Sequence, residues 1–129
     1  MDTELFELCK SVYEKLGWET SSLAGWIEAH QEYEADNGDY TNENHPPSAL
    51  YTSDYILEKL PARIWNKEES QWDGLWLRKW DRGNELVYFA EYWTRFSFPK
   101  QVESDTPLKA LLKLTLKLAD EGIITKGDK

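Results

Sequence analysis

The chain has 129 residues, of which 24 are Asp or Glu and 15 are Lys or Arg, so its formal net charge is −9. A chain of this length is expected to form one domain, residues 1–129, that buries its apolar surface without disulfides or a structural metal. The single cysteine, Cys9, cannot form an internal disulfide, and no stretch approaches the roughly 20 apolar residues of a membrane span. We therefore expect a cytoplasmic protein that does not contact membranes.

The negative charge is concentrated in one segment. Between Leu16 and Glu58 there are nine acidic residues and no Lys or Arg, so the other 15 acidic residues are balanced by 15 basic ones. Such a surface repels phosphate backbones, which disfavours direct nucleic-acid binding, and it suits a protein partner with a basic surface. The candidate partner-binding residues are Glu28, Glu32, Glu34, Asp36, Asp39 and Glu43. In the simpler interpretation, the same charges only keep the protein in solution.

The first predicted element is a helix over about residues 2–16. Apolar side chains recur at helical spacing on one stripe, formed by Leu5, Leu8, Cys9, Val12 and Leu16, and Gly17 follows as a C-terminal stop.

Residues 18–51 are expected to form an acidic, loop-rich insert. The segment from Leu23 to Tyr33 can form a helix capped by Ser21 or Ser22, although Gly25 weakens it, and Asn, Asp, Gly and Pro residues then predict a loop. A connection this long is usually functional or mobile. The alternative is an acidic loop that covers the surface, with Trp18, Trp26 and Tyr33 at the edge of the core.

A short helix and a strand are expected next. Thr52 or Ser53 caps the helix, whose apolar face carries Tyr55, Ile56 and Leu60, and Pro61 ends it. Residues 62–66 predict a first strand.

The strongest local signal is a β-hairpin within residues 72–98, in which two aromatic and β-branched runs flank the turn Asp-Arg-Gly-Asn. A turn centred on Arg82 and Gly83 would place Trp80 opposite Glu85 and Trp76 opposite Phe89. One face would then carry Leu75, Leu77, Leu86, Tyr88, Ala90 and Tyr92, and the other Trp76, Trp80, Val87 and Phe89 with Arg78, Glu85 and Glu91. Both faces are apolar enough to need a helix layer or a partner subunit.

The last helix is capped by Asp105 or Thr106, has Pro107 in its first turn and ends at Gly122. Its apolar stripe is formed by Leu108, Leu111, Leu112, Thr115, Leu118 and Ala119, whereas Lys109, Lys113 and Lys117 are expected on the outer face. Residues 123–129 are predicted to be a flexible tail. The expected fold is α+β: an α-β-α layered sandwich with a small antiparallel sheet and N- and C-terminal helices.

Three segments resemble the phage ABA sandwich domain family, which consists of short phage and prophage proteins of unassigned activity. They are the helix leading into Gly17-Trp18, the capped segment from Tyr51 to Leu60, and the opening of the last helix from Glu103 to Leu112. The resemblance implies helix, sheet and helix layers and a phage or prophage origin, and it implies no catalytic role.

Motifs for catalysis or metal binding are weak. His30 and His45 lie near Glu28, Glu32 and Glu43 without paired ligand spacing, so surface histidines are the simpler interpretation and we predict no metal. The acidic loop places its glycine wrongly for a calcium loop. Cys9 lies on a core stripe, and no nucleophile elbow or phosphate loop occurs. We therefore predict no catalytic residues and no cofactor.

The tryptophans offer a second candidate site. Trp76, Arg78, Trp80 and Phe89 share one face of the hairpin and could stack a ligand or form a homodimer, in which Arg78 and Glu91 of two copies would cross-pair at the rim. The alternative is that a helix covers this face.

Three functions remain open: a non-enzymatic, phage-type interaction protein, with charge mimicry as an extension; a small-molecule or nucleotide binding module that uses the Trp-rich face; and a small enzyme working through carboxylates or a His-bound metal.

Overall fold

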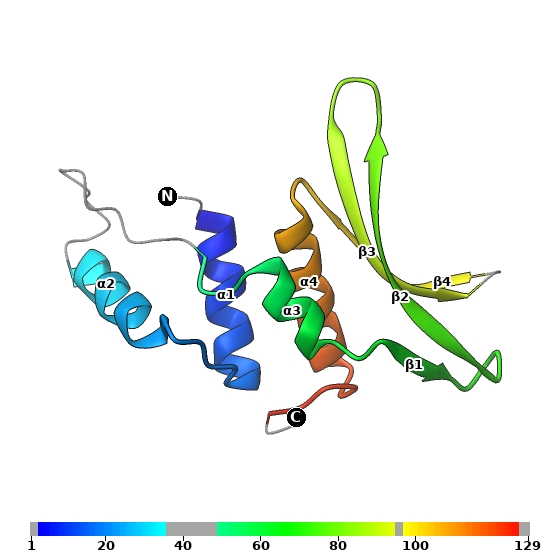
Figure 1. Ribbon diagram of the computed structural model, residues 1–129, viewed down its shortest axis with the longest axis horizontal. Coiled ribbons are helices and arrows are strands. Elements are labelled where there is room, and N and C mark those ends of the chain that lie inside the picture. Colours follow the sequence, from blue (N-terminus) through cyan, green and yellow to red (C-terminus); the bar gives the residue numbers. More distant parts are fainter. Residues whose placement is uncertain (1–2, 36–48, 95–96, 127–129) are drawn as a thin grey trace.

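The computed structural model describes residues 3–35, 49–94 and 97–126. In these ranges the helices are α1 (Thr3–Leu16), α2 (Leu23–Ala35), α3 (Ser53–Lys59) and α4 (Pro107–Asp120), and the strands are β1 (Arg63–Asn66), β2 (Gln71–Asp81), β3 (Leu86–Thr94) and β4 (Ser97–Ser104) (Figure 1). The predicted α+β fold, with an antiparallel sheet and N- and C-terminal helices, is confirmed. None of the described helices is long and apolar enough to cross a membrane.

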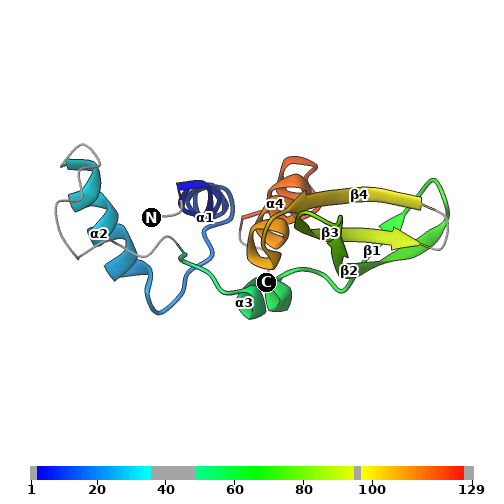
Figure 2. The ribbon, with the colours of Figure 1, turned by 90° about the horizontal axis from the view of Figure 1, so that it is seen from above.

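The layers of the fold follow one another in the order α1, α4 and sheet (Figure 2). The strands pair in the order β1-β2-β3-β4, and each pair is antiparallel. Helix α4 packs on β3 and β4, whereas α1 and α3 pack on α4. The two terminal helices thus stand on the same side of the sheet.

The buried core lies between α1, α4 and the inner face of the sheet. Its fully buried side chains include Cys9 and Val12 of α1, Leu111 and Leu112 of α4, and Tyr92 of β3. The Tyr92 hydroxyl donates a hydrogen bond of 2.6 Å to the Pro61 carbonyl, which ties the chain just before β1 to β3.

The helix boundaries agree with the sequence signals. Thr52 and Thr106 cap α3 and α4 through hydrogen bonds from the backbone N–H groups three residues later. Gly17 follows α1 with a φ of +67°, a left-handed conformation that favours glycine. Trp18 and Trp26 are buried, as expected, whereas the side chain of Tyr33 lies outside the described residues.

The predicted hairpin register is wrong by two residues. Trp80 pairs with Val87 and Trp76 with Glu91, because the connection spans Arg82 to Glu85. The side chain of Asp81 accepts a hydrogen bond of 2.7 Å from the backbone N–H of Gly83, whose φ of +90° a residue with a Cβ rarely adopts. A shift of two residues leaves every side chain on its predicted face, so the assignment of the two faces is correct.

Candidate functional site

The face of the sheet opposite α4 carries most of the tryptophans. The register places Trp72, Trp76, Arg78 and Trp80 of β2 on this side, with Phe89, Glu91 and Trp93 of β3, Arg63 and Trp65 of β1, and Gln101 of β4. We call these ten residues the Trp face. Four of its tryptophans have exposed fractions of 50 or 51%: Trp65, Trp72, Trp76 and Trp80. The helices that the structure describes therefore leave these rings open to solvent.

The aromatic rings of the Trp face contact one another and the arginines between them. Trp65 meets Trp72 edge-on with 5.4 Å between ring centroids, and Trp76 lies 5.1 Å from Trp93. The guanidinium of Arg63 lies 4.4 Å from the ring centroid of Trp72. These cation–π and aromatic contacts hold the rings in position before any ligand arrives.

A buried carboxylate fixes the central arginine. Glu91 is fully buried, its Oε1 accepts a hydrogen bond of 2.7 Å from Arg78 Nε, and its Oε2 accepts one of 2.6 Å from Gln101 Nε2. The guanidinium carbon of Arg78 lies 4.7 Å from the Phe89 ring centroid and 5.9 Å from that of Trp80. In the single chain this ion pair is intramolecular and Glu91 is fully buried, and the cross-pairing of Arg78 and Glu91 between two copies stays a prediction.

Glu28, the acidic candidate whose side chain the structure describes, belongs to α2 at the other end of the molecule from the sheet (Figure 1). Helix α2 and the sheet are separated by α1 and α4 (Figure 1). Glu28 of α2 is exposed, as are Asp54 and Glu58 of α3. Glu32 and Glu34 belong to α2, but their side chains lie outside the described residues, as do Asp36, Asp39 and Glu43 altogether. The structure does not bring Glu28 together with the Trp face.

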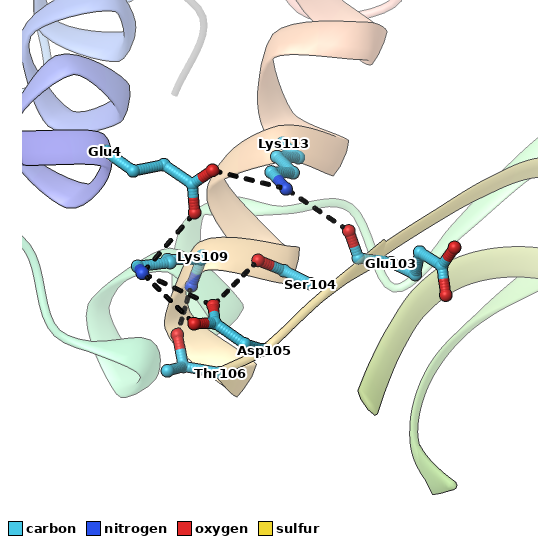
Figure 3. Close-up of polar contacts among 7 residues, drawn as sticks. All are labelled: Glu4, Glu103, Ser104, Asp105, Thr106, Lys109 and Lys113. Carbon is cyan, nitrogen blue, oxygen red and sulfur yellow. Dashed lines mark hydrogen bonds and ion pairs between the residues drawn. The ribbon is translucent and has the colours of Figure 1, made fainter. Parts of the chain in front are cut away.

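A polar cluster joins α1 to the start of α4 (Figure 3). Lys109 is only 6% exposed, and its Nζ lies 3.4 Å from a carboxylate oxygen of Glu4 and 3.3 Å from one of Asp105. The hydrogen bond from Lys109 holds the pKa of Asp105 below its usual range. The prediction that Lys109 lies on the outer face is therefore wrong, and the cluster ties two helices together.

The remaining candidates for catalysis or metal binding are Cys9, His30 and His45. Cys9 is fully buried, and burial raises the pKa of its thiol. His45 and the side chain of His30 lie outside the described residues. In the ranges that the structure covers, no three His, Cys, Asp or Glu side chains are grouped so that they could hold a metal ion.

Comparison with known proteins found no matching family model, no matching curated protein and no matching solved structure. The resemblance to the phage family thus stays a prediction.

Sequence reasoning missed four members of the Trp face: Arg63, Trp65, Trp93 and Gln101. Their place on this face depends on how β1 and β3 pair with β2 and how β4 pairs with β3. Gly74 of β2, for example, pairs with both Arg63 and Trp93. Strand alternation alone puts Trp72, Trp76 and Trp80 on one face but gives no pairing across strands.

Proposed function

We propose that the protein is a non-enzymatic binding protein that contacts a protein partner through the Trp face. The observation that carries the proposal is the row of four half-exposed tryptophans, Trp65, Trp72, Trp76 and Trp80. Soluble proteins seldom expose so much contiguous aromatic surface without using it.

The chemistry of the Trp face suits a protein partner. Tryptophan and arginine are the residues most enriched at the energetic centres of protein interfaces. The rings and Arg78 are already held by their neighbours, so little side-chain freedom is lost on binding. The net charge of −9 disfavours nucleic acid and attracts a basic protein, so the partner is a basic protein with an apolar patch.

The acidic segment contributes to the same proposal. Exposed acids such as Glu28, Asp54 and Glu58 extend the negative charge over α2 and α3, away from the Trp face, and act over longer distances on the approach of a basic partner. A phage or prophage origin and charge mimicry of DNA are further parts of the proposal, and they rest on the sequence resemblance and the charge.

The proposal is tested with a partner captured by the whole chain, identified by mass spectrometry, purified and titrated back. Trp76→Glu and Trp80→Glu should weaken binding by about tenfold or more, because each places a charge in a desolvated contact. The matched control is Leu57→Glu, which changes an exposed apolar residue of α3. Equal affinities for all three variants would reject the Trp face as the contact surface, whatever the partner. Affinity that is unchanged in molar salt would reject the electrostatic attraction of a basic partner, but not the contact through the Trp face.

A homodimer is the other protein partner predicted from the sequence. Light scattering at micromolar concentration distinguishes the two: a mass near 15.2 kDa rules out the dimer, whereas a dimer that Trp76→Glu converts to a folded monomer assigns the face to self-association.

A stacking ligand is the second candidate function. The half-exposed rings of Trp76 and Trp80, separated along β2 by Arg78, favour a ligand that stacks on an aromatic ring, such as the base of a nucleotide or the apolar face of a sugar ring. Quenching of tryptophan fluorescence by such a ligand in the wild type, and its loss in Trp80→Ala, would support this function.

A further inference from the structure

Arg63 differs from the other two arginines that the structure describes, because its charge is not paired with a carboxylate. Arg78 forms an ion pair with Glu91, and Arg82 forms one with Glu103. The side chain of Arg63 is exposed, and its guanidinium lies over the ring of Trp72, 4.4 Å from the centroid, without an ion pair or a hydrogen bond to any described residue. In a chain with a net charge of −9, an arginine without a carboxylate is unexpected.

The guanidinium of Arg63 lies among the rings of the Trp face. Arg63 pairs with Gly74 and Trp65 pairs with Trp72, so these side chains share the outer side of the sheet. Trp65 meets Trp72 edge-on and so supports the ring that lies under the guanidinium. The indole Nε1 of Trp76 lies 3.5 Å from the position that a Cβ on Gly74 would take. The β1 end of the Trp face therefore combines a positive charge, an N–H donor and aromatic rings.

A partner that covers this end of the Trp face must also cover Arg63, because the guanidinium lies over Trp72. Removing water from a charge that has no counterion is strongly unfavourable, and a cation–π contact does not neutralise the charge. The carboxylates of Glu91 and Glu103 are already paired with other arginines. The counterion of Arg63 in a complex therefore has to come from the partner.

We propose that the protein partner of the Trp face presents an Asp or Glu side chain that pairs with Arg63, an inference that rests on the proposed function. A carboxylate accepts two parallel hydrogen bonds from a planar guanidinium. Its single charge matches the single charge of Arg63, whereas a phosphate dianion would be repelled by the excess negative charge of the chain. The partner is then basic over most of its surface, which favours its approach, and acidic at this one contact.

The chemistry of the contact is tested in the whole chain with phenylacetate and its neutral analogue phenylacetamide. NMR follows the Nε–H signal of Arg63 and the indole N–H signal of Trp72, and the Nε–H signal of Arg78, which is already bonded to Glu91, is the internal control. We expect saturable shifts of the first two signals with phenylacetate, and binding of phenylacetamide that is about tenfold weaker or more. Phenyl phosphate should bind no more tightly than phenylacetate. Equal binding of the acid and the amide, no saturable response to either, or tighter binding of phenyl phosphate would overturn the proposal.

Two variants of Arg63 assign the response to this side chain. Arg63→Gln removes the charge and should abolish the difference between phenylacetate and phenylacetamide. Arg63→Lys should restore only part of the difference, because an ammonium group lacks the planar pair of donors. A difference that persists in Arg63→Gln would place carboxylate binding elsewhere and contradict the proposal.

The captured partner tests the same contact in the complex. Arg63→Glu should weaken its binding by about tenfold or more, and exchange of one acidic residue of the partner for arginine should restore the binding. The matched control is Lys79→Glu, which makes the same change of charge at an exposed residue of β2 that faces away from the Trp face.

The outcomes separate this inference from the proposed function. Equal affinities for Arg63→Glu and Lys79→Glu, beside weakened binding by Trp76→Glu, would reject the pairing with Arg63 and leave the proposed function standing. Equal affinities for Trp76→Glu and Leu57→Glu would reject the Trp face as the contact surface, and the pairing with it.

Discussion

Two ion pairs in this protein differ in burial, and burial determines how much an ion pair contributes to the free energy of unfolding. Glu91 has no exposed surface and receives hydrogen bonds from Arg78 and Gln101, whereas Lys15 and Asp120 form a pair in which both side chains are about half exposed. Water screens the second pair but not the carboxylate of the first. The two pairs should therefore differ strongly in their contributions to stability.

Arg78→Met should lower the free energy of unfolding by about 2 to 3 kcal/mol, because it leaves the buried carboxylate of Glu91 with Gln101 alone. Lys15→Met, the exposed control, should cost less than about 1 kcal/mol. Urea unfolding followed by circular dichroism measures both. Equal losses would contradict the role assigned to Glu91.

Cys9 gives a prediction for the dependence of stability on pH. Burial raises the pKa of its thiol above the ordinary value of 9.0, so the folded state keeps a proton that the unfolded chain releases. The stabilisation is complete at lower pH and is lost as the pH rises above about 9. Urea unfolding between pH about 8 and 10 should show a steeper fall in the wild type than in Cys9→Ala. Parallel pH profiles would show that the thiol does not contribute.

At the scale of helices and strands, the sequence predicted where most elements lie along the chain, but it predicted less well which residues of different elements contact one another. Apolar spacing and capping residues indicated α1, α3 and α4, because both signals are local. The hairpin register depends on the length of its turn, and the turn accommodates two more residues than expected. The burial of Lys109 was missed because its partner Glu4 lies on a helix distant in sequence.

Helix α4 should be the element on which the fold depends most, because it packs against α1, α3 and the sheet. Leu112 is fully buried, and Leu112→Ala should cost about 2 to 5 kcal/mol of the free energy of unfolding. Leu57→Ala, in α3, removes a side chain that is 38% exposed and should cost less than about 1 kcal/mol. Thermal and urea unfolding of the two variants provide the comparison, and a small loss for Leu112→Ala would be inconsistent with the layer order.

At the scale of the whole molecule, both terminal helices lie on one side of the sheet, and this arrangement creates the candidate site. The sequence predicted two apolar faces and left open whether a helix covers the second. Whether a helix covers the second face depends on where α1 packs. Helix α1 packs on α4, with Cys9 and Val12 in the shared core, and so it does not cover the Trp face. Strand alternation could predict Trp76 and Trp80 on one face, but not whether that face is open.

The central claim is that the Trp face is exposed in the free protein and is covered by a protein partner. Hydroxyl-radical footprinting with mass spectrometry measures the oxidation rate of each tryptophan separately. We expect Trp65, Trp72, Trp76 and Trp80 to be oxidised rapidly in the free chain, Trp18 and Trp26 slowly because they are buried, and Trp76 and Trp80 to become protected when the captured partner is added. Slow oxidation of Trp76 and Trp80 in the free monomer, or no change in their rates on partner binding, would contradict the account.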